Sequence, residues 1–200
     1  MTLHSNEPPS SDETLMLAFS KGAGDAFAEL FRRYQQPIFG YFCRRVAERA
    51  LAEELTQETF LALYRAGTRY EPRALFRTYL YAMAIKILHA YRRKALFRVA
   101  FSGSQKVAAH VSMRDSTQAN LWIRRAVEKL NVSDREVLLL REFEQLSYAE
   151  ISDLLKLPLN TVRSRLFRAR LALKDLLEPA KNPDAALQGS AVLAEKEGQT

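Results

Sequence analysis

The sequence has few of the residues that build disulfides, metal sites or membrane spans. Its 200 residues include one cysteine, Cys43, so neither an internal disulfide nor a Cys-rich zinc site can form. The three histidines, His4, His89 and His110, are not spaced as ligands, and we expect no metal and no other cofactor. No apolar run approaches the ~18 residues of a membrane span, which predicts no membrane insertion. Residues 1–11 lack the features of a signal peptide, which predicts a cytoplasmic protein.

Helix-breaking residues are also scarce. The chain has seven glycines and seven prolines, with no proline between Pro72 and Pro158 and no glycine between Gly103 and Gly189. Apolar residues in these segments recur at helical spacing, without a convincing alternating strand pattern. With 48% hydrophobic and 26% charged residues, the composition is that of a folded soluble chain. The sequence therefore predicts an all-α protein.

A change of composition divides the helical pattern into two small domains. Ser, Gly and Gln gather between the two blocks, as in a flexible linker. We expect a disordered N-terminus over 1–11, a first domain over 12–97, a linker over 98–119, a second domain over 120–177 and a loose tail over 178–200. The first domain should hold helices near 12–20, from 25 with a break permitted at Pro37, over 48–65 and over 74–94. Capping boxes are expected at Ser10 with Glu13, Ser133 with Glu136 and Ser147 with Glu150.

The second block contains the pattern of a helix-turn-helix. A capped helix after Ser147 leads to a turn at Pro158, and the next helix should bury Val162, Leu166, Ala169 and Leu173 on one stripe. Its other faces carry hydroxyls and guanidinium groups, which fit the major groove of DNA because arginine binds guanine bidentately. A basic solvated helix is the alternative for the arginines alone. The candidate contacts are Thr161, Arg163, Ser164, Arg165, Arg168 and Arg170.

The net charge of +7 favours a polyanionic partner, and a second basic surface lies in the first block. No acidic residue occurs between Glu71 and Asp115, where cations and aromatic residues alternate. This mixture suits a separated nucleic-acid strand, because unpaired bases stack on rings. Thr78, His89, Arg92 and Arg93 should project from the helix over 74–94, opposite its core stripe.

The helix over 48–65 is acidic on an otherwise basic protein. Glu54, Gln57, Glu58 and Leu61 share its outer face at helical spacing. A solvated face is the plain interpretation of such spacing, and a protein partner is the functional one.

These segments together resemble a known family. Ala52–Leu61, Phe76–Tyr81 and Arg92–Lys94 resemble region 2 of bacterial sigma factors, and Ser147–Ile151 with Asn160–Arg170 resembles their region 4. The short linker leaves no room for the intervening domain of larger sigma factors. The architecture therefore resembles the extracytoplasmic function (ECF) class.

The resemblance implies a subunit of RNA polymerase without catalytic residues of its own. Region 2 would bind the β′ clamp of core polymerase through Glu54, Gln57, Glu58 and Leu61, and would hold the −10 element open. Region 4 would read the −35 element through the helix-turn-helix residues and meet the β flap. An anti-sigma factor is an expected partner. The candidates for the −10 element are Tyr70, Arg73, Arg77, Tyr79, Lys86, Arg92 and Arg93.

The chain departs from the family pattern at four positions in region 2. Tyr79 stands where Trp is usual, Ile85 and Lys86 replace Arg-Asn, and Ala90 lies near a usual Asp. These changes predict an altered −10 preference.

A stand-alone helix-turn-helix regulator is the alternative function. Such regulators usually dimerise on paired half-sites, and this sequence has neither a long heptad seam nor a ligand-binding domain. No arrangement typical of an enzyme is present, and Cys43 is interpreted as a packing residue.

Overall fold

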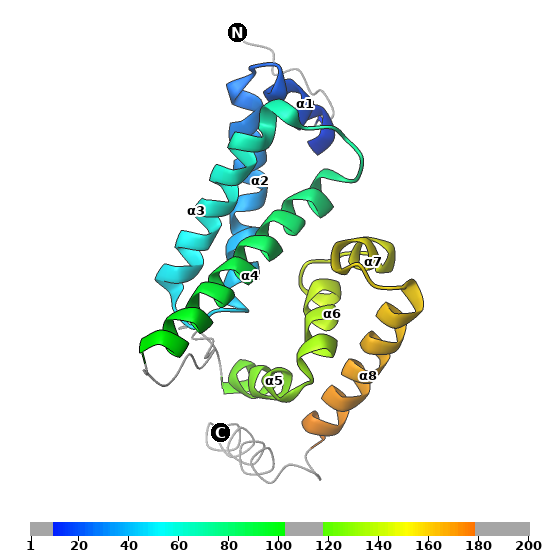
Figure 1. The fold of residues 1–200 in the computed structure, drawn as a ribbon. Helices are drawn as coiled ribbons and strands as arrows, with labels where there is room; N and C mark the ends of the chain where they lie inside the picture. The colour runs from blue at the N-terminus through cyan, green and yellow to red at the C-terminus, as the bar shows by residue number, and fades with distance from the viewer. Residues whose placement is uncertain (1–9, 103–117, 179–200) are drawn as a thin grey trace, which may run out of the picture. The chain divides into compact units, whose positions relative to one another are not determined.

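The computed structural model describes residues 10–102 and 118–178. Within these ranges every regular element is a helix and no strand occurs, which confirms the all-α prediction (Figure 1). The chain divides into two compact units, residues 1–113 and 114–200. The predicted disorder of the N-terminus up to residue 9, the linker over 103–117 and the tail from 179 lie outside the described residues.

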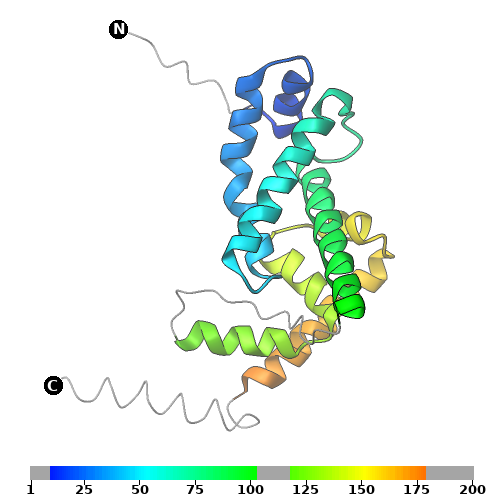
Figure 2. The ribbon, with the colours of Figure 1, turned by 60° about the vertical axis from the view of Figure 1, so that its left-hand side comes forward.

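The first unit is a bundle of four helices. It comprises α1 (Asp12–Ser20), α2 (Gly24–Cys43), α3 (Arg49–Ala66), the 3-10 turn η1 (Gly67–Arg69) and α4 (Phe76–Ser102). Helices α2, α3 and α4 run side by side, and α1 lies across the end where α2 begins and α3 ends (Figures 1 and 2). Fully buried apolar side chains from all four helices form the core: Met16, Leu30, Ile38, Phe42, Leu55, Leu63, Phe76 and Leu80.

The ends of two of these helices, α1 and α4, differ from the expectation. The N-cap of α1 is Ser11 and not Ser10, since the Ser11 hydroxyl accepts from the backbone N–H of Thr14. Helix α2 continues through Pro37, which is exposed, so the carbonyl left without a helical partner can be hydrated. Helix α4 runs to Ser102, and residues 98–102 are therefore helical rather than part of the linker.

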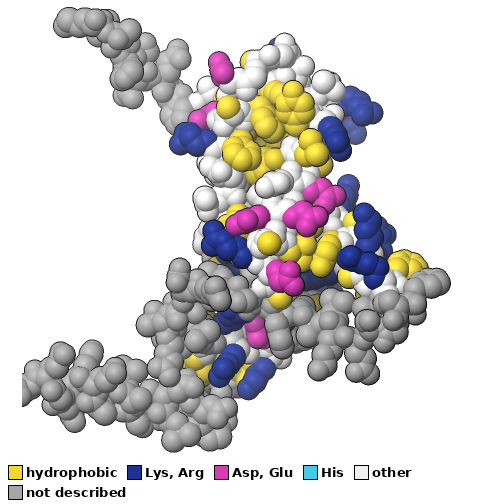
Figure 3. Space-filling model, turned by 90° about the vertical axis from the view of Figure 1, so that its left-hand side faces the viewer, with side chains coloured by type: hydrophobic (Ala, Val, Ile, Leu, Met, Phe, Trp, Pro, Cys, Tyr) yellow, Lys and Arg dark blue, Asp and Glu magenta, His cyan; other side chains and the backbone are white. Residues whose placement is uncertain are grey.

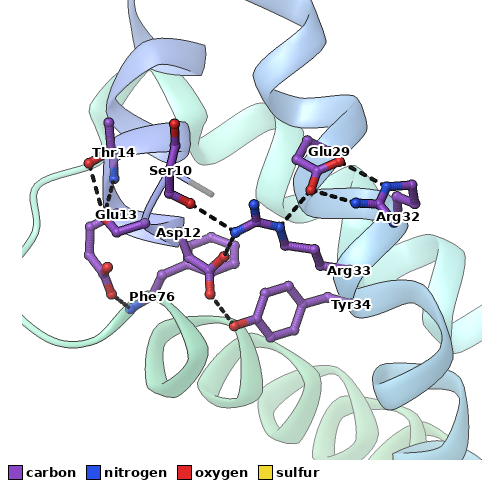
Figure 4. A network of polar contacts seen from close by, with 10 residues as sticks. Ser10, Asp12, Glu13, Thr14, Glu29, Arg32, Arg33, Tyr34 and Phe76 are labelled. Carbon is purple, nitrogen blue, oxygen red and sulfur yellow. Dashed lines mark hydrogen bonds and ion pairs between the residues drawn. The ribbon is translucent and has the colours of Figure 1, made fainter. Parts of the chain in front are cut away.

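A polar network ties α1 to α2 (Figure 4). The guanidinium of Arg33 donates to Asp12 and Glu29, each at 2.7 Å, and the hydroxyl of Tyr34 donates to Asp12 at 2.5 Å. Hydrogen bonds from Arg32 and Arg33 lower the pKa of Glu29 to about 2. The Glu29 carboxylate therefore stays ionised, and the network intact, at any pH near neutrality.

Over residues 118–178, the second unit has four helices, α5 (Gln118–Lys129), α6 (Val132–Glu142), α7 (Tyr148–Leu155) and α8 (Leu159–Leu177). The capping box of Ser147 and Glu150 is confirmed. The box predicted at Ser133 is wrong, because Asn131 is the N-cap of α6 and its side chain accepts from the Ser133 N–H at 3.0 Å. The core consists of Ala126, Val137, Leu140, Leu146, Ile151, Val162, Leu166 and Ala169.

Cys43 is half-buried at the last position of α2, as expected of a packing residue. Burial raises the pKa of its thiol, and nearby Arg49 offsets this only in part. Because the thiolate is the reactive form, we expect iodoacetamide at about pH 8 to alkylate Cys43 roughly tenfold more slowly in the folded chain than in urea. Equal rates, measured by mass spectrometry, would instead indicate an open and reactive thiol.

Candidate functional site

The turn between α7 and α8 is built from backbone geometry and one hydroxyl. Lys156 ends α7 in the left-handed region, with φ of 55°, and the Ser152 hydroxyl donates to the carbonyl of Leu157. Pro158 then serves as the N-cap of α8 with φ of −57°. Asn160 lies inside the first turn and is not the cap; its side-chain oxygen accepts from Arg163 at 3.3 Å. The helix-turn-helix predicted from the sequence is therefore present, with a defined turn between α7 and α8.

Helix α8 buries the predicted stripe and exposes the rest. Val162, Leu166 and Ala169 have at most 1% of their surface exposed, whereas Leu173, the last member of the stripe, is half-buried. Of the groove candidates, Arg163, Ser164, Arg168 and Arg170 are exposed, whereas Thr161 and Arg165 are half-buried. Phe167 is 68% exposed beside them, an apolar group available to a thymine methyl or to a protein.

Two of the predicted groove arginines are held by acids of α6. Arg168 donates two hydrogen bonds to Asp134, at 3.0 and 3.1 Å, and Arg170 donates to Glu142 at 2.6 Å. The guanidinium of Arg168, although exposed, therefore turns back to the start of α6. Within the described part of the chain, Arg165 makes no ion pair.

The aromatic candidates for the −10 element pack against one another. Tyr70, at the end of η1, is 7% exposed, and its ring lies 5.3 Å from that of Tyr79 and 6.5 Å from that of Phe76. Burial raises the pKa of Tyr70 and of Tyr79. Tyr70 therefore offers little ring surface to a base in this conformation, whereas the half-buried Tyr79 offers more.

The basic candidates of α4 are mostly on the surface. Lys86, Arg92 and Arg93 are exposed, and Arg92 donates to the carbonyl of Arg45 at 3.3 Å. Arg77 is half-buried, and Arg73 is paired with Glu71 two residues before it.

One side chain of α4 lies on the opposite side from the one expected. Thr78 is 8% exposed, so the prediction that it projects outward is wrong. Ile85 is also buried, at 9%, which suits an apolar residue where the family has Arg. Helix α4 packs on α3 and also meets α1 and α2, so its buried arc is wider than one stripe.

The predicted outer face of α3 is exposed along its length. Glu54, Gln57, Glu58 and Leu61 all face solvent, with Leu61 48% exposed, while the opposite side packs against α2 and α4. Figure 3 shows acidic and hydrophobic side chains gathered on this side of the molecule.

An aromatic cluster next to this face was not predicted. The rings of Phe19, Phe27 and Tyr64 lie within 5.3 Å of one another, and Tyr64 is 55% exposed. Phe31 stacks edge-on against Phe60 and is 40% exposed. The spacing of Phe27 and Phe31 on one face of α2 was the available signal, but their contacts with Tyr64 and Phe60 of α3 depend on tertiary packing.

Metal-binding clusters and membrane-spanning helices are both absent from the described ranges. No three His, Cys, Asp or Glu side chains there come together as metal ligands would. None of the helices over 10–102 and 118–178 is both long and apolar enough to cross a membrane.

Comparison with known proteins gives two family matches in chain order. Residues 30–97 match Sigma-70 region 2, and residues 120–173 match Sigma-70, region 4. The RNA polymerase sigma-H factor of Pseudomonas aeruginosa is 32% identical over 184 residues, covering 84% of this chain and 94% of the relative. The ECF RNA polymerase sigma-E factor of Escherichia coli is 30% identical over 183 residues, covering 84% and 95%.

Among solved structures, the fold is similar to that of the sigma factor RpoE from Bartonella quintana, described in complex with the anti-sigma factor NepR. The TM-score is 0.63 at 21% identity, covering 76% of this chain and 96% of the other.

Proposed function

Because this chain belongs to the ECF class of bacterial RNA polymerase sigma factors, we propose that it binds core polymerase and directs it to promoters through both helical units. The observation that carries this proposal is the contrast between two exposed helix faces. Helix α8 presents cations and hydroxyls from a helix-turn-helix, whereas α3 presents acids next to apolar groups. The first face suits DNA and the second suits a basic protein partner.

The second unit is proposed to place α8 in the major groove at the −35 element. The exposed Ser164 and Arg163 and the unpaired Arg165 are the favoured readers of base edges. Arg168 and Arg170, each held by an acid, are better suited to phosphates, where a guanidinium fixed in place positions the helix without reading sequence. Apolar surface groups of this unit, such as Phe143 at 53% exposure, are available to the β flap.

The first unit is proposed to hold the non-template strand of the −10 element on segment 67–75 and α4. The exposed Lys86, Arg92 and Arg93 would follow its phosphates, and the ring of Tyr79 would stack on a base. The phenol at this position and the buried Ile85 support a −10 preference that differs from that of better-matched family members.

Helix α3 is proposed to dock on the β′ clamp through Glu54, Gln57, Glu58 and Leu61. Polymerase forms the phosphodiester bonds, so the chain needs no catalytic residue. We propose that the protein acts in the cytoplasm. An anti-sigma factor is proposed as a regulator, supported by the fold it shares with a sigma factor that is described with such a partner.

The test is run-off transcription with purified core polymerase on a library of promoter-like duplexes. We expect transcripts that depend on this protein and map to a shared pair of elements. A chain that gives no transcripts but shifts duplex DNA by itself, as a dimer, would establish the stand-alone regulator instead.

A further inference from the structure

Helix α1 touches both ends of the segment 67–75. At the start of the segment, the ring of Phe19 covers the backbone of the buried Gly67 so closely that an added Cβ would overlap it. At the end, the carboxylate of Glu13 accepts a hydrogen bond of 2.8 Å from the backbone N–H of Phe76, the first residue of α4 (Figure 4). Helix α1, nine residues long, therefore holds the segment at two points, and we call these two contacts the grip.

The contact at Phe76 is a helix cap supplied from a distance. The first N–H groups of a helix have no partner within the helix, and an anion there is favoured by the helix dipole. Glu13 provides both the acceptor and the charge, although it lies 63 residues away in the sequence. The cap fixes where α4 begins and, with it, where the segment must end.

The middle of the segment depends on the same helix. Tyr70 is packed on Phe76, the residue that Glu13 holds, and its buried hydroxyl has no hydrogen-bond partner among the described residues. A tyrosine with an orphaned hydroxyl gains little from polar contacts at its site. Its position is therefore set by packing on Phe76 and, more closely, on Tyr79, so a shift of the start of α4, which carries both rings, would move it.

Helix α1 is itself held in place. Arg33 of α2 donates to the side chain of Asp12 and, at 3.0 Å, to the carbonyl of Ser10, while Tyr34 donates to Asp12 as well. These bonds attach the start of α1, which carries Glu13, to α2. The matched Sigma-70 region 2 begins at residue 30, so the whole of α1 lies outside it.

We propose that α1 is a positioning element for the −10 element, and that Glu13 is its positioning residue, acting through the Phe76 N–H on segment 67–75. The role of this segment at the −10 element rests on the proposed function. The contacts of α1 with the segment are independent of it. Glu13 touches no DNA in this scheme. It presets the segment so that an unpaired base meets a formed surface.

The first arm of the test measures the grip in the free, full-length chain. Amide hydrogen exchange at residues 67–76 should speed up about fivefold or more in Glu13→Ala, the effect of losing a helix cap. Glu13→Gln keeps an acceptor oxygen but loses the charge, and should exchange at a rate between those of the parent and Glu13→Ala. Glu53→Ala is the matched control, because it removes an exposed acid that pairs with Arg49 of its own helix near the start of α3, at the end of the bundle away from α1. Unchanged exchange in Glu13→Ala would overturn the proposal.

The second arm uses core polymerase and a promoter recovered by the run-off experiment. For each variant, transcription is measured on the parent promoter and on promoters with the −10 or the −35 bases replaced. The fold loss of transcription on each replacement is the −10 penalty or the −35 penalty, and the two are compared. Glu13→Ala should reduce the −10 penalty about fivefold and leave the −35 penalty unchanged. Simple destabilisation would lower all transcripts alike, and that result, or an equal change in both penalties, would overturn the proposal. Absence of transcripts from the parent chain would instead refute the proposed function, with the exchange arm still deciding the grip.

Discussion

The double variant Glu54→Lys/Glu58→Lys should lose binding to core polymerase by about 3 kcal/mol or more, which is more than a hundredfold in affinity. Both carboxylates are on the exposed face of α3, where they bear no part of the core. A basic partner surface that attracts them would repel two lysines, and like charges at an interface cost several kcal/mol. Exposed positions within a helix accept lysine readily, so thermal unfolding should change little.

Binding can be measured by the shift of labelled protein into the polymerase fraction on gel filtration. Glu128→Lys is the control for each single Glu→Lys change, because it makes that substitution on α5 of the other unit, where Glu128 pairs with Arg124 of its own helix. Each single variant of α3 should show an intermediate loss. If the double variant binds as the parent does, the polymerase contact lies elsewhere, and the aromatic cluster around Tyr64 becomes the first alternative.

The second large effect is expected at the helix-turn-helix. Arg165→Ala should weaken binding of holoenzyme to its own promoter by about 1–3 kcal/mol, with the loss confined to promoters that keep the base it reads. Arg165 makes no ion pair within the described residues, so its guanidinium is available for a base edge. Arg168→Ala should weaken binding to all sequences more evenly, because Asp134 holds that guanidinium in one position.

Competition binding against a promoter series substituted through the −35 element separates these outcomes. Lys174→Ala is the control, as this cation lies near the far end of α8 and is 72% exposed. A uniform loss for Arg165→Ala would identify it as a phosphate contact. A base-specific loss for Arg168→Ala would mean that DNA draws it away from Asp134.

The parts of the fold that the sequence predicts well are those with local causes. Breaker-free segments and the Ser147 box place α7 and α8 almost to the residue, because caps and periodicity act within one turn. The failures have causes at long range or in close competition. Ser11 and Asn131 are the N-caps, rather than the nearby Ser10 and Ser133. Thr78 is buried because α4 packs against more than one neighbouring helix.

The candidate sites divide in the same way. Exposure of Glu54 and Glu58 follows from helical spacing, and the structure agrees. Pairing of Arg168 with Asp134, across 34 residues, could not be inferred, because charge in the sequence does not say which acid a folded helix brings near. The burial of Tyr70 likewise depends on rings that only the folded unit assembles.

The distance in sequence between Glu13 and Phe76 also sets a timetable for synthesis. At a ribosomal rate of about 5–20 residues per second, the 63 residues between them take roughly 3–13 s to emerge. Until Phe76 emerges, Glu13 has no helix to cap and the side chain of Met16 is not yet fully buried. The second unit joins α6 to α8 over about half that span. The nascent amino-terminal bundle is therefore the half of this protein with the longer need for protection by chaperones.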